Sequence, residues 1–323
     1  MGPKPYKNFS HNILLHVNAF VCKFQEDSDL IFTLFDGESH RPISENYVVK
    51  WSRTGIARDI DQFDNNRVLF TDLSKNDVNI PKMYLVCYAV RIGSMEMKEN
   101  DSKRTSITNT MLTAASKKHS QLSISSSGSF TGSEYIMRRP FGVAFKDLTP
   151  IINKPEDFKG NLDMPFILCE KDCLDGTLRK LIANKDIGKI DSRMCVTVEV
   201  LQGDIKQIKE EFPRLLHTNV PIARKMGFPE VILPGDVRND LYLTLCSGEF
   251  ARMAKTSEKN VEVTITVCNE QGQMVPGVMS IGSGLAPIDE YKSVVYYHDD
   301  KPKWLETFKV GSNLSHHITI EVF

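Results

Sequence analysis

Short runs of apolar and β-branched residues, separated by polar turns, recur along most of the chain. Residues 261–268, for example, alternate valine or isoleucine with Glu262, Thr264, Thr266 and Cys268. A period of two is typical of a strand with one buried face. Similar runs occupy residues 12–17, 29–35, 46–51, 67–73, 83–92, 141–148, 194–201, 241–246, 260–268, 291–297 and 317–323. Short strands broken by polar turns predict antiparallel β-sandwiches rather than alternating βαβ units.

Helix-like patterns are few. Residues 175–185 and 205–216 have the apolar spacing of short amphipathic helices, and Pro213 limits the second of them. Because strands dominate on both sides of these stretches, we expect a mainly all-β fold.

A chain of 323 residues is long enough for two domains, each with its own core. We expect two antiparallel sandwich-like units that meet between about Val200 and Asp240. The expected boundaries are residues 1–200 for the first unit, 201–238 for a helical or loop linker, and 239–323 for the second unit.

Residues 99–134 break the strand pattern. They are rich in Ser, Thr and Lys and nearly free of large apolar side chains, so they cannot bury enough surface to offset the entropy of ordering. We predict a disordered insertion between two strands of the first unit, which limited proteolysis should cut first. The stretches KRTS and KKHS place hydroxyls beside basic residues, as many kinases prefer, and an unmodified flexible loop is the alternative.

Overall charge argues against a generally basic nucleic-acid-binding protein. Forty Lys and Arg residues face 41 Asp and Glu residues, so any anion site must be a local patch. The longest clear apolar run, near Met83–Val90, is far shorter than a membrane span, and no signal peptide opens the chain. We therefore expect a cytoplasmic protein with no nucleic-acid partner.

Motifs for catalysis or metal binding are absent from the sequence. There is no P-loop, dinucleotide fingerprint, nucleophile elbow or HExxH motif, so we expect no catalytic residue and no cofactor, with an undetected active site as the alternative. The seven cysteines lie mostly in strand-like runs, which indicates reduced thiols. Cys169 and Cys173 form the only close pair, and without a second pair at metal spacing we expect no zinc site.

A short basic segment precedes the strand-like run 260–268. It contains Arg252, Lys255 and Lys259 beside Met253, with no regular spacing. Such a segment is either a solvated turn or a site that binds an anion, and the position of neighbouring loops decides between the two.

Strand direction predicts what lies beside this segment. If residues 241–246 and 260–268 form a hairpin, the segment lies at one end of the sandwich. If residues 291–297 are the next strand, the turn that follows them returns to the same end and brings Lys301 and Lys303 there.

Five cations on one rim would suit a polyphosphorylated headgroup, for which lysine supplies point charge and arginine a bidentate fork. Met253 and Trp304 would then enter the membrane interface. A solvated rim without a ligand is the alternative, because acidic residues lie close by: Glu249, Glu258, Asp299, Asp300 and Glu306. Calcium is disfavoured, since only Asp299 and Asp300 are suitably placed and the first loop offers lysines.

Several longer segments resemble the DOCK (dedicator of cytokinesis) family. At the start of its first homology region the matching segments are RKMGFPEVILPGDVRNDLYLTL (224–245), KNVEVTITV (259–267), EYKSVVYY (290–297) and KPKWLETFKV (301–310). In its N-terminal region they are LFTDL (69–73), RRPFGVAF (138–145) and LQGDIKQI (201–208). The resemblance covers nearly the whole chain, and it is strongest to the branch that acts on Rac with an ELMO partner.

This resemblance implies a C2-type sandwich that binds phosphatidylinositol 3,4,5-trisphosphate through basic loops at one end. The family has basic residues where Arg252, Lys255 and Lys259 stand here, whereas Ala251 and Met253 replace its usual acid and glycine. Nucleotide exchange on Rac is carried in the family by a separate helical region. A C2-type fold has eight strands, and the pattern predicts about four after Asp240, so we expect the sandwich to be incomplete at Phe323.

Overall fold

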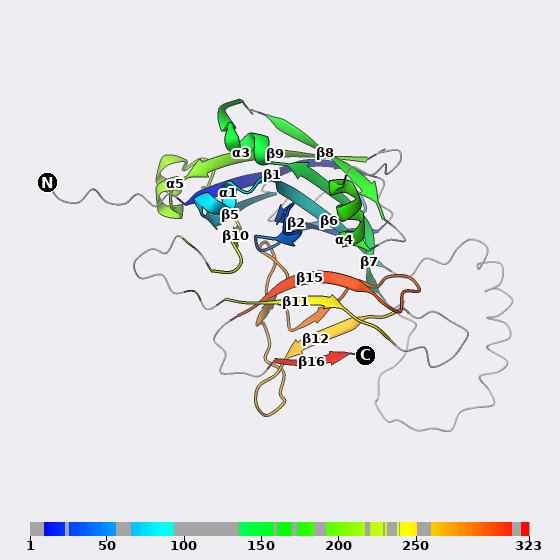
Figure 1. The fold of residues 1–323 in the computed structure, drawn as a ribbon. Coiled ribbons are helices and arrows are strands. Elements are labelled where there is room, and N and C mark those ends of the chain that lie inside the picture. The colour runs from blue at the N-terminus through cyan, green and yellow to red at the C-terminus, as the bar shows by residue number, and fades with distance from the viewer. Residues whose placement is uncertain are drawn as a thin grey trace, which may run out of the picture.

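The computed structural model describes residues 10–22, 26–55, 66–93, 136–157, 160–169, 173–183, 192–216, 220–228, 230, 238, 240–250, 260–311 and 318–322. These residues form two β-rich units that contact each other (Figure 1). The prediction of a mainly β fold with few helices is confirmed. The predicted insertion at 99–134 lies outside the described residues. No helix among the described ranges is long and apolar enough to cross a membrane.

The N-terminal unit is built on a ten-stranded sheet with the order β10-β5-β1-β9-β8-β7-β6-β2-β3, and β4 also pairs with β2. Its strands are β1 (His11–Val21), β2 (Asp27–Asp36), β3 (Arg41–Pro42), β4 (Tyr47–Trp51), β5 (Arg67–Leu73), β6 (Met83–Gly93), β7 (Met137–Asp147), β8 (Asn161–Leu168), β9 (Ser192–Gln202) and β10 (Ile222–Arg224). All neighbours are antiparallel except β10 and β5. β10 lies within the residues expected to form a linker and extends the edge of this sheet.

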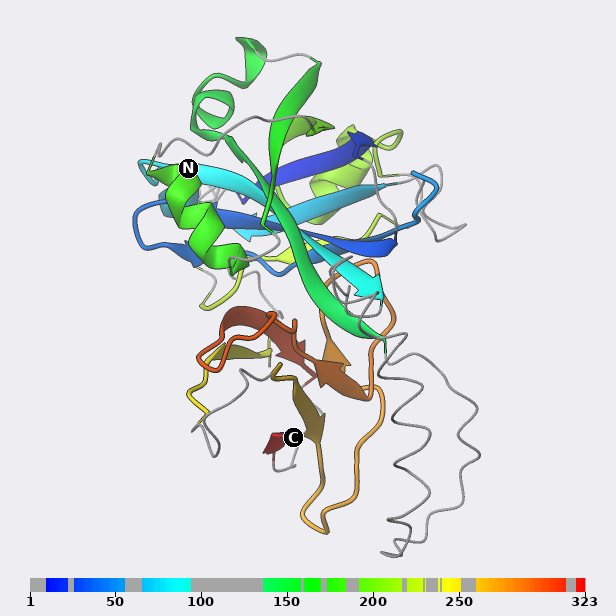
Figure 2. The same ribbon diagram turned by 90° about the vertical axis from the view of Figure 1, so that its right-hand side faces the viewer.

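The sheet curls, so that its inner face encloses one core (Figures 1 and 2). Phe20 of β1 and Trp51 of β4 illustrate the curl: their strands are not neighbours, yet their ring centroids lie 6.3 Å apart. Phe20 also meets Phe166 of β8 edge-on at 4.9 Å. Alternate residues of each strand point into this core, as the period-two pattern requires.

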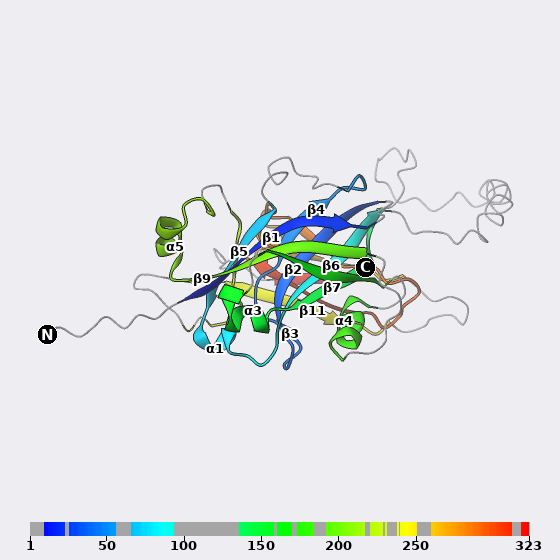
Figure 3. The same ribbon diagram turned by 90° about the horizontal axis from the view of Figure 1, so that it is seen from above.

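The outer face of the sheet is buried at two places. β2 and β6 are buried on both faces, because their outward residues pack against α4 (Leu174–Ile182) and the C-terminal unit. Continuous apolar runs are typical of such doubly covered strands. At the other end of the sheet, α5 (Ile205–Glu211) covers the outer face with Ile208 (Figure 3). Asp204 and Gln207 form a capping box that starts α5, and the helix ends before Pro213 as expected.

Three further helical turns complete the described part of the N-terminal unit. They are α1 (Lys75–Val78), α3 (Thr149–Asn153) and the 3₁₀ turn η2 (Pro155–Asp157). α1 begins at Ser74, whose side chain accepts a hydrogen bond from Asp77 N while the Asp77 carboxylate accepts one from Ser74 N.

The C-terminal unit packs two three-stranded sheets face to face, as expected for a C2-type sandwich. One sheet contains β11 (Leu241–Ser247), β15 (Lys303–Val310) and β13 (Met279–Ser280); the other contains β14 (Glu290–Lys292), β12 (Val263–Val267) and β16 (Ile318–Val322). Tyr291 and Phe308 stack across the two sheets with ring centroids 4.5 Å apart. The described part of this unit therefore has six strands, more than the four expected.

The predicted hairpin between residues 241–246 and 260–268 is wrong. β11 pairs with β15, and β12 pairs with β14 and β16, so the two runs lie in different sheets. The strand expected at 291–297 ends at Lys292, and the strand at 303–310 was not predicted. Alternation marks a strand but carries no information about its partner, because the same pattern suits any neighbour with a buried face.

Candidate functional site

The structure locates two of the five predicted headgroup contacts, Lys301 and Lys303. The other predicted lipid-binding and membrane-contact residues lie outside the described residues: Arg252, Met253, Lys255 and Lys259. The described part of the candidate site consists of the residues that flank this segment on both sides.

The described residues on either side of 251–259 are both hydrogen-bonded to one turn. On the first side, Phe250 N donates a hydrogen bond to Asp300 O at 2.9 Å. On the second side, His298 N donates to the Asn260 side-chain oxygen at 2.8 Å. Phe250 and Asn260 thus both lie beside residues 298–300. The expected adjacency of the two loops holds for their described parts, although it arises from a different strand pairing.

The pairing of β11 with β15 explains this adjacency. β11 ends where β15 begins, with Ser247 opposite Lys303 in the register. Gly248 N continues the contact by donating to Pro302 O at 3.1 Å. We call the end of the sandwich formed by residues 248–250 and 298–303 the rim.

The charges of the described rim partly offset one another. Lys301 forms an ion pair with Glu249, and both side chains are well exposed, at 64% and 71%. Lys301 N also donates to the Asp299 carboxylate at 2.9 Å. Lys303 is exposed at the start of β15. Exposed ion pairs contribute about 0–1 kcal/mol, so the pair with Glu249 constrains Lys301 only weakly.

Trp304 does not reach the surface of the rim, and its predicted entry into a membrane is wrong. Its side chain is 3% exposed, and its indole nitrogen donates to Val294 O at 2.7 Å. Phe250 packs edge-on against it at 6.4 Å between centroids. Trp304 lies on the inward side of β15, where it supports the rim from within the sandwich core.

Metal ligands do not gather in the described part of the chain. None of its His, Cys, Asp and Glu residues form a group of three or more that could hold a metal ion. Asp299 and Asp300, the carboxylates best placed for calcium by sequence, lie in the turn that is hydrogen-bonded to Phe250 and Asn260.

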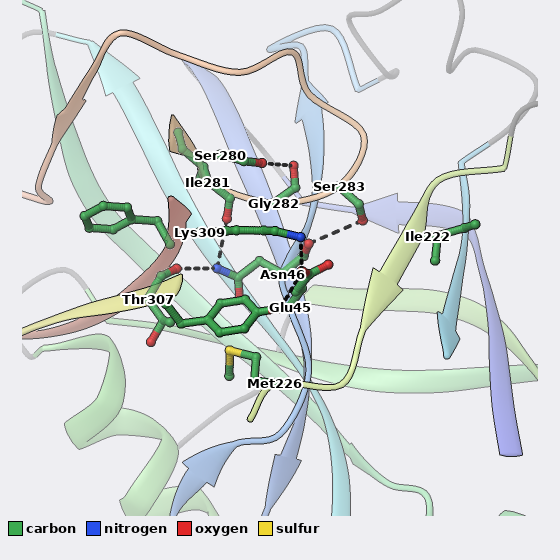
Figure 4. A pocket seen from close by; sticks show the side chains of 12 residues that line it. Glu45, Asn46, Ile222, Met226, Ser280, Ile281, Gly282, Ser283, Thr307 and Lys309 are labelled. Carbon is green, nitrogen blue, oxygen red and sulfur yellow. Dashed lines mark hydrogen bonds and ion pairs between the residues drawn. The ribbon is translucent and has the colours of Figure 1, made fainter. Parts of the chain in front are cut away.

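A second polar site, not predicted from sequence, lies between the two units. Glu45, in the connection between β3 and β4, accepts hydrogen bonds from Tyr242 Oη at 2.7 Å and from Lys309 Nζ at 3.1 Å. Tyr242 and Lys309 are opposite one another on β11 and β15. They border a cavity of about 270 Å³ between the units (Figure 4).

Backbone contacts lie beside this cavity. Asn46 donates from its side chain to Ile281 O at 3.1 Å and to Thr307 O at 3.0 Å. Its carbonyl accepts from Ser283 N at 2.8 Å, and Val48 N donates to Ser283 O at 3.0 Å. A Cβ atom on Gly282 would lie 2.6 Å from Asn46 O, so this close approach requires glycine.

A third contact between the units is a buried ion pair. Arg138 of β7 lies 3.3 Å from Glu306 of β15 and donates to Lys292 O at 2.7 Å. Glu306 also accepts from Val294 N at 3.0 Å and from Tyr291 Oη. Burial raises the pKa of Glu306, and the Arg138 charge and the Val294 hydrogen bond oppose this rise.

Comparison with known proteins gives a consistent result for both units. The family profile described as DOCK N-terminus matches residues 3–229, and the profile described as the C2 domain in Dock180 and Zizimin proteins matches residues 234–322. The chain is 30% identical over 312 residues to human dedicator of cytokinesis protein 4 and 31% identical over 311 residues to human dedicator of cytokinesis protein 3. These alignments cover 95% and 93% of the chain.

The same alignments cover 14% of each relative, so the chain spans a small part of the length of these proteins. Its two units correspond to the N-terminal region and the C2 domain that the profiles describe. On the extent of the profile matches and of the alignments, the chain belongs to the DOCK (dedicator of cytokinesis) family.

Proposed function

We propose that this chain is the membrane-recruitment part of a DOCK-type guanine-nucleotide exchange factor for Rac. In this proposal the rim binds phosphatidylinositol 3,4,5-trisphosphate and brings a cytoplasmic protein to the plasma membrane. The proposed headgroup contacts are five cations: Arg252, Lys255, Lys259, Lys301 and Lys303. Met253 is the proposed membrane contact. Exchange on Rac and binding of ELMO belong to other parts of the parent protein.

One observation supports the proposal: the residues that flank the basic segment, Phe250 and Asn260, are both hydrogen-bonded to the turn that contains Lys301. Phe250 N donates a hydrogen bond to Asp300 O, and His298 N donates one to the Asn260 side-chain oxygen. No residue between Phe250 and Asn260 is more than five positions from one of these two anchors, and five extended residues span at most about 18 Å. Lys259 directly precedes Asn260. Chain connectivity therefore favours convergence of the cations on the rim.

The chemistry of these side chains suits a polyphosphate. Lysine offers a compact charge with three donors, and arginine offers a fork that binds two phosphate oxygens. The formal charge of the whole chain is −1, so attraction of an anion must come from a local cluster of this kind. Lys301 can exchange its exposed carboxylate partner, Glu249, for a headgroup phosphate at little cost.

A protein-interaction scaffold with no lipid binding is the second candidate. The acidic neighbours of the rim favour this scaffold. Lys301 already forms an ion pair with Glu249. In addition, Asp299 and Asp300 lie in the same turn as Lys301. In this reading the two units serve to dock other parts of the parent or a partner protein.

Vesicle co-sedimentation separates the two candidates. Vesicles that contain phosphatidylinositol 3,4,5-trisphosphate are compared with vesicles of equal total charge that contain only phosphatidylserine. The proposal predicts stronger binding to the trisphosphate vesicles, with weaker binding as salt rises because exposed charges are screened. Absence of binding to both vesicle types by folded protein would favour the scaffold.

A further inference from the structure

The interface between the two units has a polar network on one side that the lipid-binding proposal does not use. Five charged side chains alternate in sign along it. Asp72 of β5 lies 3.4 Å from Arg238, which lies 2.8 Å from Asp240. Asp240 lies 2.7 Å from Lys309, which lies 3.1 Å from Glu45. The chain of charges begins and ends on the N-terminal unit, and we call it the Glu45 network.

Tyr242 ties this network together. Its hydroxyl donates to Glu45 and accepts from Arg238 Nη2 at 3.1 Å. The network is only partly buried, since the side chains of Lys309 and Asp72 are 30% and 24% exposed. Partly exposed charges of this kind are accessible to water and to salt.

The packing around this side of the interface is loose. The segment 280–288 of the C-terminal unit lies between two cavities, of about 270 Å³ and about 360 Å³. Ile281 lines both of them, and Glu45 and Lys309 line the first (Figure 4). Surfaces that border cavities make fewer dispersion contacts, so polar bonds carry more of the attachment here.

The side of the interface that contains Arg138 and Glu306 is more closely packed and shielded from solvent. Arg138 and Glu306 have side chains only 13% and 15% exposed, and the Arg138 guanidinium lies over the Tyr291 ring at 5.5 Å from its centroid. Val295 N donates to Arg138 O at 2.8 Å. Apolar residues continue the core from the N-terminal unit into the C-terminal unit, among them Val86, Val294 and Trp304.

We propose that the Glu45 network is a latch, and that without it the C-terminal unit opens from the N-terminal unit about a hinge at the Arg138–Glu306 pair. The latch fixes the angle between the units, and the apolar contacts near Arg138 hold them together. Local opening of this kind is expected where buried apolar contacts are few and hydrogen bonds are close to solvent. The inference does not depend on lipid binding.

Three backbone amides report on the opening. Val48 N and Ser283 N bond across the interface on the latch side, and Val295 N bonds across it at the hinge. Hydrogen exchange of these amides is measured in the full chain for the wild type, E45Q and Y242F. G282A is a fourth protein, because its methyl group would press on Asn46 O without changing any charge.

Loss of a charged hydrogen bond in E45Q should speed exchange at Val48 and Ser283 by about tenfold or more. Exchange at Val295 should stay within about twofold of the wild type, because the hinge remains closed. Y242F and G282A should give the same pattern. E210Q on the exposed face of α5 removes one carboxylate far from the interface and serves as the matched control.

Two results would overturn the proposal. Unchanged exchange at Val48 and Ser283 in all three variants would show that the network does not hold the interface. Equal acceleration at Val48, Ser283 and Val295 would show that the units separate completely, or that the protein unfolds, instead of turning about a hinge. Circular dichroism and the unfolding midpoint identify a variant that fails to fold, and the remaining two then decide the question.

Discussion

Arg138 and Glu306 form an ion pair across the interface, 3.3 Å apart, with one residue from each unit. Glu306 lies on β15 inside the C-terminal unit, and Arg138 reaches it from β7 of the N-terminal sheet. Removing a charge from water costs several kcal/mol, so a buried carboxylate needs a cation nearby. The N-terminal unit therefore supplies the cation that balances the buried carboxylate of the C-terminal unit.

The first prediction concerns this pair. R138Q leaves Glu306 without its cation and should lower the free energy of unfolding by about 3–5 kcal/mol at pH 8. R138Q/E306Q should lose less than the sum of the two single variants, because the lone buried charge is gone. Urea unfolding of the four proteins measures this coupling. Additive losses would show that the two side chains do not interact.

The second prediction concerns pH. Burial raises the pKa of Glu306 above its ordinary value of 4.5, so the folded state holds this proton more tightly than the unfolded state. The contribution of Glu306 to stability is then fully present below pH 4.5 and is lost as the pH rises through the raised pKa. The free energy of unfolding of the wild type, minus that of E306Q, should fall across this interval. A difference that grows with pH would contradict the assignment.

The third prediction uses the two tryptophans of the chain, Trp51 and Trp304. Both are buried, at 4% and 3% exposure, in the cores of the two units. Neither should contact lipid, so tryptophan emission should keep its wavelength when trisphosphate vesicles bind. Spin-labelled lipids should not quench it. Strong quenching would show that Trp304 leaves the sandwich core and enters the membrane.

The strands of this fold were largely readable from the sequence, and their partners were not. Alternation at 260–268 identified β12, and the run at 83–92 identified β6. The pairing of β11 with β15 joins residues about sixty positions apart and depends on how the sandwich closes. β15 itself was missed, since Glu306 takes an inward position between Trp304 and Phe308 and apolar Leu305 takes an outward one.

Sequence analysis could predict part of the rim and nothing of the polar site at Glu45. Lys301 was expected near the basic loop, and the structure places it beside residues 248–250. Glu45 gave no signal, because it lies in a connection between strands where acidic residues are usually solvated. Its role depends on Tyr242 and Lys309, which approach it only after both units have folded.

The final prediction concerns the proposed headgroup contacts Lys255 and Lys259. Each charge-assisted contact contributes about 1.5–3 kcal/mol, so loss of two should weaken binding by well over tenfold. Loop lysines pack little, and K255A/K259A should unfold at the same urea concentration as the wild type. K206A/K209A is the matched control: it removes two exposed lysines from α5, at the opposite end of the molecule from α4 and the rim (Figures 1 and 3).

The affinity of these three proteins for vesicles containing phosphatidylinositol 3,4,5-trisphosphate shows whether the rim binds the lipid headgroup. We predict that the wild type and K206A/K209A bind alike, and that K255A/K259A binds more than tenfold more weakly while remaining folded. Equal binding by all three folded proteins would contradict this prediction, and the rim would then not be the lipid-binding site.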